Sequence, residues 1–490
     1  MKPEQRDFLR LIKAAAFVNP FAEKRKRIDE QALEISGGRL EGQKNVLTNL
    51  VHRVALCLEA IEKRKGARRS SLSAEDKDLR DYGHLFYLFH HFCDQYDQHI
   101  HAQVKEKEQC LVVDFADDLL HMLNARGFSV ADSERFFALF FQLRRAFYFI
   151  SRIVGGSQSM CEFRARLWNT VFSNNISLYR QRLWNRMEDF STLLLGETGA
   201  GKGMAAAAIG RSGYIPFLAK TSRFSESFVG AFTPINLCQY SQELIESELF
   251  GHRKGAFTGA LDTHQGVLSR CSPCGSIFLD EIGEVSETVQ IKLLKVLEDR
   301  NFTPVGSQRQ ERFSGRVIAA TNRNLDNLRR SGRFRDDFYY RLCSNVIVIP
   351  PLRKRLQDDP GEIKQLLQVV VERILGQEEY TIAAPLIAEL GEHFQQRQPP
   401  AYQWPGNIRE LEQRARQYLL HGCCDWSPPS PERQTAAEQL IAKIEAGSLT
   451  CKNLQQQYCR LLYIQLKTYE AVARRTGLDR RTVKKYIDGQ

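Results

Sequence analysis

The chain has 490 residues, of which 26% are charged and 43% hydrophobic, with a formal net charge of +11. This length predicts about three domains, and the composition is that of a soluble globular protein. The sequence contains no run of about 20 uncharged apolar residues, which excludes a membrane-spanning helix. The N-terminus lacks the apolar stretch of a signal peptide, and the twelve cysteines lack the spacing of a disulfide framework. We therefore expect a cytoplasmic protein with no membrane partner, and the positive charge is compatible with a polyanionic partner.

Residues 1–152 are predicted to be mostly helical, because segments such as 45–61 and 82–96 carry apolar residues at spacings of three and four. The basic runs 24–27 and 63–69 indicate solvated faces or linkers, with nucleic-acid contact as the alternative. Residues 135–154 predict a buried or interdomain helix. A histidine-rich patch could suggest a metal or haem site, but its spacing matches no ligand set, and an amphipathic helix explains it. The patch comprises His84, His90, His91, His99, His101 and Cys93.

A phosphate-binding loop is predicted where the short apolar strand 191–195 runs into a glycine-rich segment and then an alanine-rich helix. The glycines let backbone N–H groups converge, the helix N-terminus favours negative charge, and Lys202 reaches the terminal phosphates. Gly203 stands where such loops usually have a serine or threonine that contacts magnesium. The predicted nucleotide-binding residues are Gly196, Glu197, Thr198, Gly199, Ala200, Gly201, Lys202 and Gly203.

The segment 251–260 is rich in glycine, which disfavours both a buried strand and a helix. We expect an exposed loop tip that presents Phe257, with an ordinary glycine-rich surface turn as the alternative. Shortly after it, Cys271 and Cys274 form a lone CxxC pair, which favours a loop beside a strand over a zinc site.

Two carboxylates follow the next predicted strand, 276–280. Asp280 is expected near a magnesium ion and Glu281 is expected to polarise an attacking water, as in phosphoanhydride hydrolysis. Another buried strand is predicted over 316–322 and ends in Asn322. Strands that alternate with helices imply a parallel α/β sheet whose carboxyl edge binds the nucleotide.

The C-terminal part begins with a Pro- and Ser-rich linker, 423–434. Further on, 471–476 predicts a helix, Gly477 a turn, and 480–487 a second helix, which is the pattern of a helix-turn-helix. The alternative is a short basic helical pair with no role in DNA binding. The predicted DNA-binding residues are Arg480, Arg481, Thr482, Lys484 and Lys485.

From about residue 154 to about 420, these segments resemble the AAA+ domain of sigma-54-dependent transcriptional activators, the bacterial enhancer-binding proteins. The most specific match is ELFGHRKGAFTGA at 248–260; others are LDEI at 279–282, FRDDFYYRL at 334–342, PPLR at 350–353 and WPGNIREL at 404–411. The resemblance implies a multidomain fold. It consists of a mostly helical N-terminal region (1–152), an α/β AAA+ P-loop core (153–352), a helical lid (353–422), the linker (423–434) and an all-α helix-turn-helix domain of Fis type (435–490).

The resemblance also implies roles for matching residues. Arg335 and Arg341 match the arginine fingers that reach a neighbouring subunit's γ-phosphate, a task suited to a permanently charged guanidinium. Asn322 matches the γ-phosphate sensor, Arg409 the lid arginine, and Asn236 the asparagine that restrains the catalytic glutamate. The expected catalytic residues are Asp280, Glu281, Asn322, Arg335 and Arg341, with Asp280 as metal ligand; the expected sigma-54 contacts are Gly255, Ala256, Phe257, Thr258, Gly259 and Ala260.

The implied function is ATP hydrolysis, with Mg2+, that remodels sigma-54 RNA polymerase holoenzyme into the open promoter complex. Double-stranded DNA upstream of promoters and a homo-oligomeric ring, a hexamer, are the other implied partners. Two alternatives stay open: a nucleotide-gated DNA-binding regulator without remodelling activity, and an AAA+ remodeller of another protein. Residues 1–152 resemble none of the family's common sensory modules, and the segments 176–191 and 216–236 are longer than usual in it.

Overall fold

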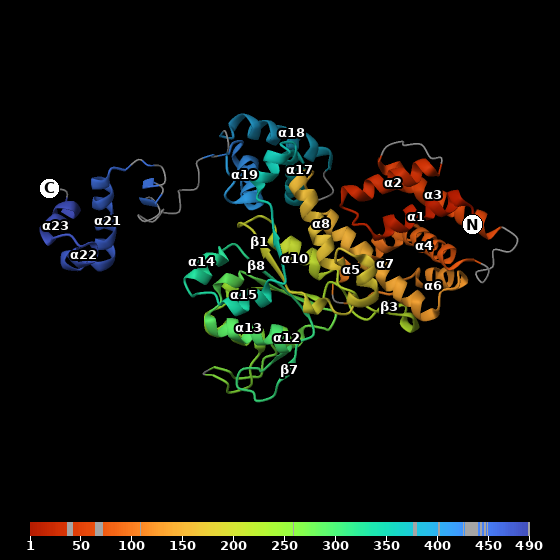
Figure 1. The fold of residues 1–490 in the computed structure, drawn as a ribbon, viewed down its shortest axis with the longest axis horizontal. Coiled ribbons are helices and arrows are strands. Elements are labelled where there is room, and N and C mark those ends of the chain that lie inside the picture. Colours follow the sequence, from red (N-terminus) through yellow and green to blue (C-terminus); the bar gives the residue numbers. More distant parts are fainter. Residues whose placement is uncertain are drawn as a thin grey trace. The chain divides into compact units, whose positions relative to one another are not determined.

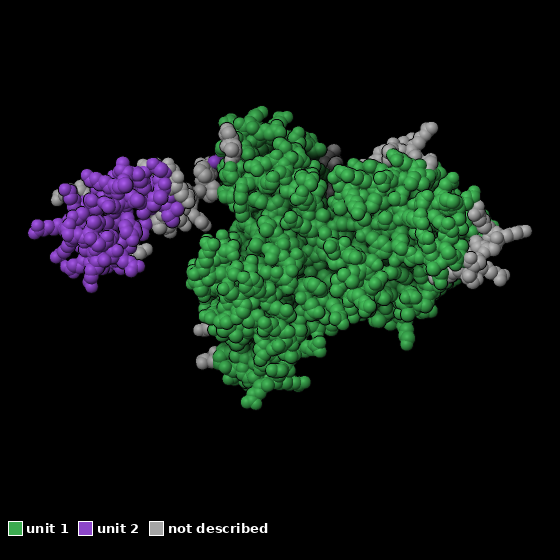
Figure 2. Space-filling model, viewed as in Figure 1, with its two compact units in different colours: residues 1–423 green, residues 424–490 purple. Residues whose placement is uncertain are grey.

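The computed structural model describes residues 1–36, 43–63, 72–107, 109–257, 259–375, 380–399, 402–424 and 449–488, with 426, 440, 441, 443, 444 and 447 as isolated positions. The chain divides into two compact units, residues 1–423 and 424–490 (Figure 2). Every helix in the described ranges is too short or too polar to cross a membrane. The predicted linker falls mostly outside the described residues.

The N-terminal part of the first unit is helical, which confirms the prediction from its apolar periodicity (Figure 1). One apolar core is formed by Leu9 and Ile12 together with Val54 and Leu79, all almost fully buried. The helices are α1 (Pro3–Phe17), α2 (Glu23–Ile35), α3 (Gln43–Glu62), α4 (Ala74–His91), α5 (Cys93–Glu106), α6 (Ala116–Ala125) and α7 (Val130–Ser151).

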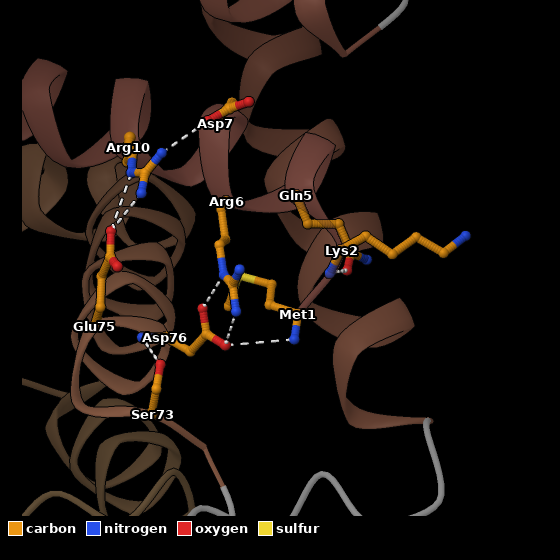
Figure 3. Close-up of polar contacts among 9 residues, drawn as sticks. All are labelled: Met1, Lys2, Gln5, Arg6, Asp7, Arg10, Ser73, Glu75 and Asp76. Atoms are coloured by element: carbon orange, nitrogen blue, oxygen red, sulfur yellow. Dashed lines mark hydrogen bonds and ion pairs between the residues drawn. The ribbon is translucent and has the colours of Figure 1, made fainter.

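Polar contacts fasten α1 to the start of α4 (Figure 3). Arg6 donates from Nε to Asp76 Oδ1 at 2.6 Å and from Nη2 to Oδ2 at 2.9 Å. Ser73 caps α4 by accepting a hydrogen bond from the Asp76 amide at 3.1 Å. The Arg6 guanidinium lowers the pKa of the buried Asp76 carboxyl to about 2.

A parallel five-stranded sheet forms the centre of the first unit, with strand order β4-β5-β8-β1-β9. The strands predicted over 191–195, 276–280 and 316–322 are confirmed as β1, β5 and β8. The full set is β1 (Thr192–Leu195), β4 (Phe232–Asn236), β5 (Ser276–Asp280), β8 (Arg316–Thr321) and β9 (Asn345–Val348).

Alternate strand residues pack into different cores, so helices cover both faces of this sheet. Leu193 and Ile277 share a core with α11 (Gln242–Phe250), α12 (Val267–Arg270), α13 (Glu287–Asp299) and α15 (Asp336–Leu342). Leu194 and Ile318 share the other core with α7, α8 (Gln158–Phe172) and α10 (Lys202–Gly210). This arrangement confirms the predicted α/β core.

The helix α7 joins the N-terminal helices to this core, as predicted for residues 135–154. A small hairpin of β2 (Phe217–Leu218) and β3 (Arg223–Phe224), within the long segment 216–236, packs on α7. Phe141 stacks on Phe224 with ring centroids 4.0 Å apart. The Val113 amide donates to the Ser222 carbonyl at 2.8 Å. The hairpin therefore binds the N-terminal helices to the sheet-containing part of the unit.

Four further helices follow the sheet: α16 (Leu352–Asp358), α17 (Glu362–Leu375), α18 (Tyr380–Arg397) and α19 (Asn407–His421). Trp404, just before α19, is fully buried. The second unit holds α21 (Cys451–Leu466), α22 (Tyr469–Thr476) and α23 (Arg480–Asp488), so both predicted C-terminal helices are present. Gly477 ends α22 with φ +72° in the left-handed region, and Val472 and Val483 pack the core.

Candidate functional site

The glycine-rich loop joins β1 to α10, as the sequence predicts. Gly199 and Gly201 have φ of +75° and +104°, a left-handed backbone that a residue with a side chain rarely adopts. A Cβ added at Gly203 would meet no atom within 4 Å, so the space in front of the helix is open. Because the first-turn amides of α10 have no intrahelical acceptor, this end of the helix suits an anion such as a phosphate.

Lys202 lies at the start of α10 and is only 8% exposed. Its Nζ donates to the Gly196 carbonyl at 3.1 Å, which holds the side chain against the end of β1. The same nitrogen lies 3.8 Å from Glu281 Oε1. The ammonium group therefore lies between the loop and the carboxylates that follow β5.

The carboxylates Asp280 and Glu281 lie at the carboxyl end of β5, beside Asn236 at the end of β4. The Glu281 amide donates to Asp280 Oδ1 at 3.1 Å. Burial, and next the charge of Glu281, raise the pKa of Asp280. A carboxylate that is costly to ionise in isolation is suited to a nearby cation, so Asp280 fits the predicted role of a Mg2+ ligand.

Asn322 connects the carboxylates to the glycine-rich loop. Its backbone N–H donates to Glu281 Oε2 at 3.3 Å, and its side-chain Nδ2 donates to Thr198 Oγ1 at 2.9 Å. Asn236 is held differently, since its Oδ1 accepts a hydrogen bond from the Cys238 amide at 3.0 Å. The carboxyl edge of the sheet thus gathers residues from four separate segments.

The WPGN segment before α19 lies directly on the glycine-rich loop. Asn407 donates from Nδ2 to Glu197 Oε2 and to the Thr198 carbonyl, both at 3.1 Å, and accepts from the Leu352 amide at 2.7 Å. A Cβ at Gly199 would lie 2.2 Å from the Gly406 carbonyl, so this close approach requires glycine. Asn407 was not among the site residues predicted from the sequence, although it belongs to the WPGN motif at 404–407.

These elements enclose a cavity of about 420 Å³. Its wall combines the glycine-rich loop, Lys202, Asp280, Glu281 and Arg409 with apolar side chains that include Ile153, Phe163, Ile349 and Val370. Amides and cations suit the triphosphate of a nucleotide, and apolar side chains suit its base. The structure therefore brings the predicted loop residues together with Asn236, Asp280, Glu281 and Arg409.

The two predicted arginine fingers lie away from this cavity. Arg335 pairs with Glu287 at 2.9 Å and with Asp337 at 2.8 Å, and Arg341 donates from Nη2 to the Leu297 carbonyl at 2.8 Å. Neither lines the cavity of its own chain. Their predicted place in a neighbouring subunit's site stays a prediction.

The glycine-rich segment around Phe257 is a loop between α11 and α12. It is anchored where His252 bridges to His264 and to Val305, and the Gly255 amide donates to the Ala260 carbonyl at 2.9 Å. Phe257 is 42% exposed and its ring lies 4.9 Å from that of His252. Thr258 lies outside the described residues. The loop therefore presents an aromatic side chain to solvent.

In the second unit, α23 carries the predicted DNA-binding residues. Val483 is buried against α21 and α22, whereas Arg480, Arg481, Lys484 and Lys485 are exposed and Thr482 is half-buried. Asp479 caps the helix by accepting from the Arg481 amide at 2.8 Å and the Thr482 amide at 3.0 Å. The basic side chains share one exposed helix, and their contact with DNA stays a prediction.

The histidine-rich patch lies on α4 and α5. His84 Nδ1 accepts from Arg126 Nε at 3.1 Å, and its Nε2 lies 3.2 Å from a Glu62 carboxylate oxygen.

The CxxC pair lies just before β5. Burial raises the pKa of the Cys271 and Cys274 thiols to about 12. Within the described ranges, no three His, Cys, Asp or Glu side chains gather in a metal-binding arrangement.

Comparison with known proteins agrees with this geometry. Residues 174–348 match the family model of the sigma-54 interaction domain. This part of the chain is therefore similar to sigma-54 interaction domains. A domain of this type is an AAA+ ATPase domain, and the resemblance to sigma-54-dependent activators seen in the sequence is confirmed.

Curated relatives share this domain over part of their length. The hydrogenase transcriptional regulatory protein HoxA of Cupriavidus necator is 41% identical over 223 residues, which are 46% of this chain and 42% of HoxA. The sigma54-dependent transcriptional activator SfnR of Pseudomonas putida is 38% identical over 233 residues, 47% of this chain and 57% of SfnR. The chain therefore spans about half the length of these relatives.

Among solved structures, NtrX from Brucella abortus in complex with ATP has 20% sequence identity to this chain. The match covers 74% of this chain and 76% of the NtrX chain. Its TM-score is 0.39.

Proposed function

We propose that this protein is an ATP-hydrolysing transcriptional activator that remodels sigma-54 RNA polymerase holoenzyme into the open promoter complex. The observation that carries the proposal is that one compact unit holds both a nucleotide-sized cavity and an exposed aromatic loop in a sigma-54 interaction domain. The cavity supplies a site for ATP, and the loop supplies a surface for a protein partner.

In this proposal the residues at the sheet edge divide the work on ATP. Lys202 and the amides of the glycine-rich loop bind the phosphates, and Arg409 approaches from the lid. Glu281, held by the Asn322 amide, orients and polarises the attacking water. Mg2+, held by Asp280, would neutralise phosphate charge when bound.

The two arginines outside the cavity are proposed to act between subunits of a homo-oligomeric ring, with six subunits as the family resemblance implies. Arg335 is bound to carboxylates at the protein surface, so its guanidinium is available to exchange these partners for the γ-phosphate of a neighbouring subunit. Arg335 directly precedes α15, and Arg341 lies on that helix, less than two turns further on. Turnover by such a site rises with subunit concentration.

DNA binding is proposed for the second unit, through α23 and double-stranded DNA upstream of promoters. The helix pair α22 and α23 with a glycine between them has the form of a helix-turn-helix, and its exposed basic side chains suit a phosphate backbone. This contact would place the ATPase near the polymerase.

The deciding experiment compares ATP turnover with open-complex formation by sigma-54 holoenzyme. Phe257→Ala is expected to keep turnover within about twofold and to abolish promoter opening, because Phe257 lies outside the cavity. Lys202→Ala, the control, is expected to lose both activities. Promoter opening by the Phe257 variant would refute the role of the loop. Absence of turnover in the wild-type protein, with ATP still bound, would favour a nucleotide-gated DNA binder.

A further inference from the structure

A second cavity, of about 290 Å³, lies where the N-terminal helices meet the sheet-containing part of the first unit. Aromatic side chains from α1, α4, α7 and α8 form a large part of its wall, and α2 adds Arg25 and Asp29. Phe17, Tyr82, Phe86, Phe140, Phe147 and Trp168 represent these aromatic side chains. A largely apolar cavity of this size with a few polar groups in its wall suits a small organic ligand.

One polar group inside this cavity is unused. His90 on α4 contacts the rings of Phe86 and Phe89, at centroid distances of 4.4 and 5.0 Å. Neither ring nitrogen has a hydrogen-bond partner among the residues that the structure describes. Burial, and next the charges of Arg25 and Arg144, lower the pKa of His90 to about 3. At neutral pH it therefore offers one free donor and one free acceptor.

A second unused group is Arg180, in the π-helix Tyr179–Leu183 that follows α8. Its guanidinium lies 5.7 Å from the centroid of the Tyr82 ring and 6.0 Å from that of Phe136. The buried Nε lacks a hydrogen-bond partner, and no carboxylate of the described residues pairs with this side chain. A π-helical turn often marks a functional site, because it is a strained way to place a side chain.

The other charged groups of the cavity wall are neutralised. Arg25 pairs with Asp29 at 2.9 Å, and Arg144 pairs with Asp97 at 2.6 Å. Arg180 thus leaves the cavity with one uncompensated positive charge. Arg180 is half-buried, and an anionic ligand would give its guanidinium the partner that it lacks among the described residues.

We propose that this cavity binds a small organic acid, whose apolar body packs among the rings and whose carboxylate pairs with Arg180. The rings disfavour a strongly hydrated ligand such as a free phosphate or sugar, and the positive charge of Arg180 disfavours a cation. A hydrocarbon without a polar group would leave Arg180 and His90 unpaired.

The ligand would contact both parts of the first unit. His90 belongs to the N-terminal helices, whereas Trp168 belongs to α8. This helix packs directly on α10, which begins with Lys202 of the proposed ATP site. Occupancy would therefore change the packing between the N-terminal helices and the ATPase part. Binding itself does not depend on the proposed function; only an effect on ATP turnover does.

The test is titration of the full-length protein with octanoate and phenylacetate, followed by calorimetry and by tryptophan fluorescence, since Trp168 lines the cavity. We expect saturable 1:1 binding of at least one acid, and at least tenfold weaker binding of its neutral amide, octanamide or phenylacetamide. Arg180→Gln is expected to weaken the acid tenfold or more and leave the amide unchanged. Arg182→Gln, an exposed arginine in the same π-helix, is the matched control and is expected to bind normally.

The following binding results would overturn the proposed site. If neither acid saturates at millimolar concentration, the cavity is a packing defect. Equal affinity for acid and amide, or full binding by Arg180→Gln, would refute pairing with Arg180. If the glutamine variant does not fold, Arg180→Lys replaces it in the test. This variant keeps the charge and is expected to retain part of the affinity for the acid. Acid binding without any change in ATP turnover would leave the site intact and remove only its effect on the proposed activity.

Discussion

Arg353 binds Glu197 through two hydrogen bonds, of 2.8 and 2.6 Å, and so joins α16 to the glycine-rich loop. Asn407 adds a third hydrogen bond to the same carboxylate at 3.1 Å. The two ion-pair partners are 33% and 40% exposed, so solvent screens the attraction and the pair contributes little to stability. Its consequence is geometric, because it fixes α16 against the loop that lines the proposed nucleotide cavity.

Glu197→Ala is therefore expected to raise the KM for ATP several-fold while changing the free energy of unfolding by less than about 1 kcal/mol. Steady-state turnover and urea unfolding measure the two quantities. Glu162→Ala, an exposed glutamate on α8, serves as control and is expected to change neither. A large loss of stability with unchanged KM would instead make the pair a structural contact.

Replacement of Glu281 by glutamine is expected to reduce kcat for ATP by about 100-fold or more while keeping nucleotide affinity, since loss of a positioned base costs this much. The substitution preserves size and removes the charge 3.8 Å from Lys202. Single-turnover hydrolysis and nucleotide binding separate the two effects. Glu298→Gln on α13 is the control; a kcat unchanged in Glu281→Gln would exclude Glu281 as the base.

Acid should weaken the contact between α1 and α4. The pKa of Asp76 is about 2 in the folded chain against an ordinary 3.8. Because the pKa is lower in the folded chain, the ionised carboxylate stabilises the fold at any pH above the pKa of the unfolded chain. This contribution is lost as the pH falls from about 4 to about 2. Asp76→Asn is expected to lower the free energy of unfolding at pH 7 by about 1 to 2 kcal/mol, which is the contribution of a charged hydrogen bond partly screened by solvent. The variant is also expected to show a flatter dependence of stability on pH in that window. Urea unfolding at pH 7, 4 and 3 measures both.

The control for this experiment is Asp78→Asn, whose carboxylate pairs with the exposed Lys13. It is expected to change stability by less than about 0.5 kcal/mol. If Asp76→Asn kept the wild-type pH dependence between pH 4 and 2, another group would be responsible for acid sensitivity there.

On α23, the double substitution of Lys484 and Lys485 by alanine is expected to weaken binding to duplex DNA and to reduce the salt dependence of log K by about 0.9 per lost phosphate contact. Fluorescence anisotropy at several salt concentrations measures the slope. Lys467→Ala, at the end of α21, is the matched control. An unchanged slope in the double variant would place DNA contact elsewhere.

The regular parts of the fold follow from local patterns in the chain. Apolar runs that end in glycine or carboxylates predicted β1 and β5, and a glycine between two amphipathic segments predicted α22 and α23. The order of the five strands was not predictable in this way, because β8 pairs on one side with β5, where Ser276 faces Arg316, and on the other with β1, where Thr192 faces the distant Ile318. The docking of β2 and β3 on α7 is a long-range contact of the same kind.

The sequence by itself determined which residues can bind a phosphate and which loop can present an aromatic ring, because both depend on glycine and a few neighbours. Only the tertiary structure decided that Asn407 and Arg353 reach the glycine-rich loop, and that Arg335 and Arg341 lie outside the cavity of their own chain. The same holds for the placement of His90 and Arg180 in the wall of one cavity. Burial and the loss of hydrogen-bond partners arise when distant segments pack together, and no local pattern records them.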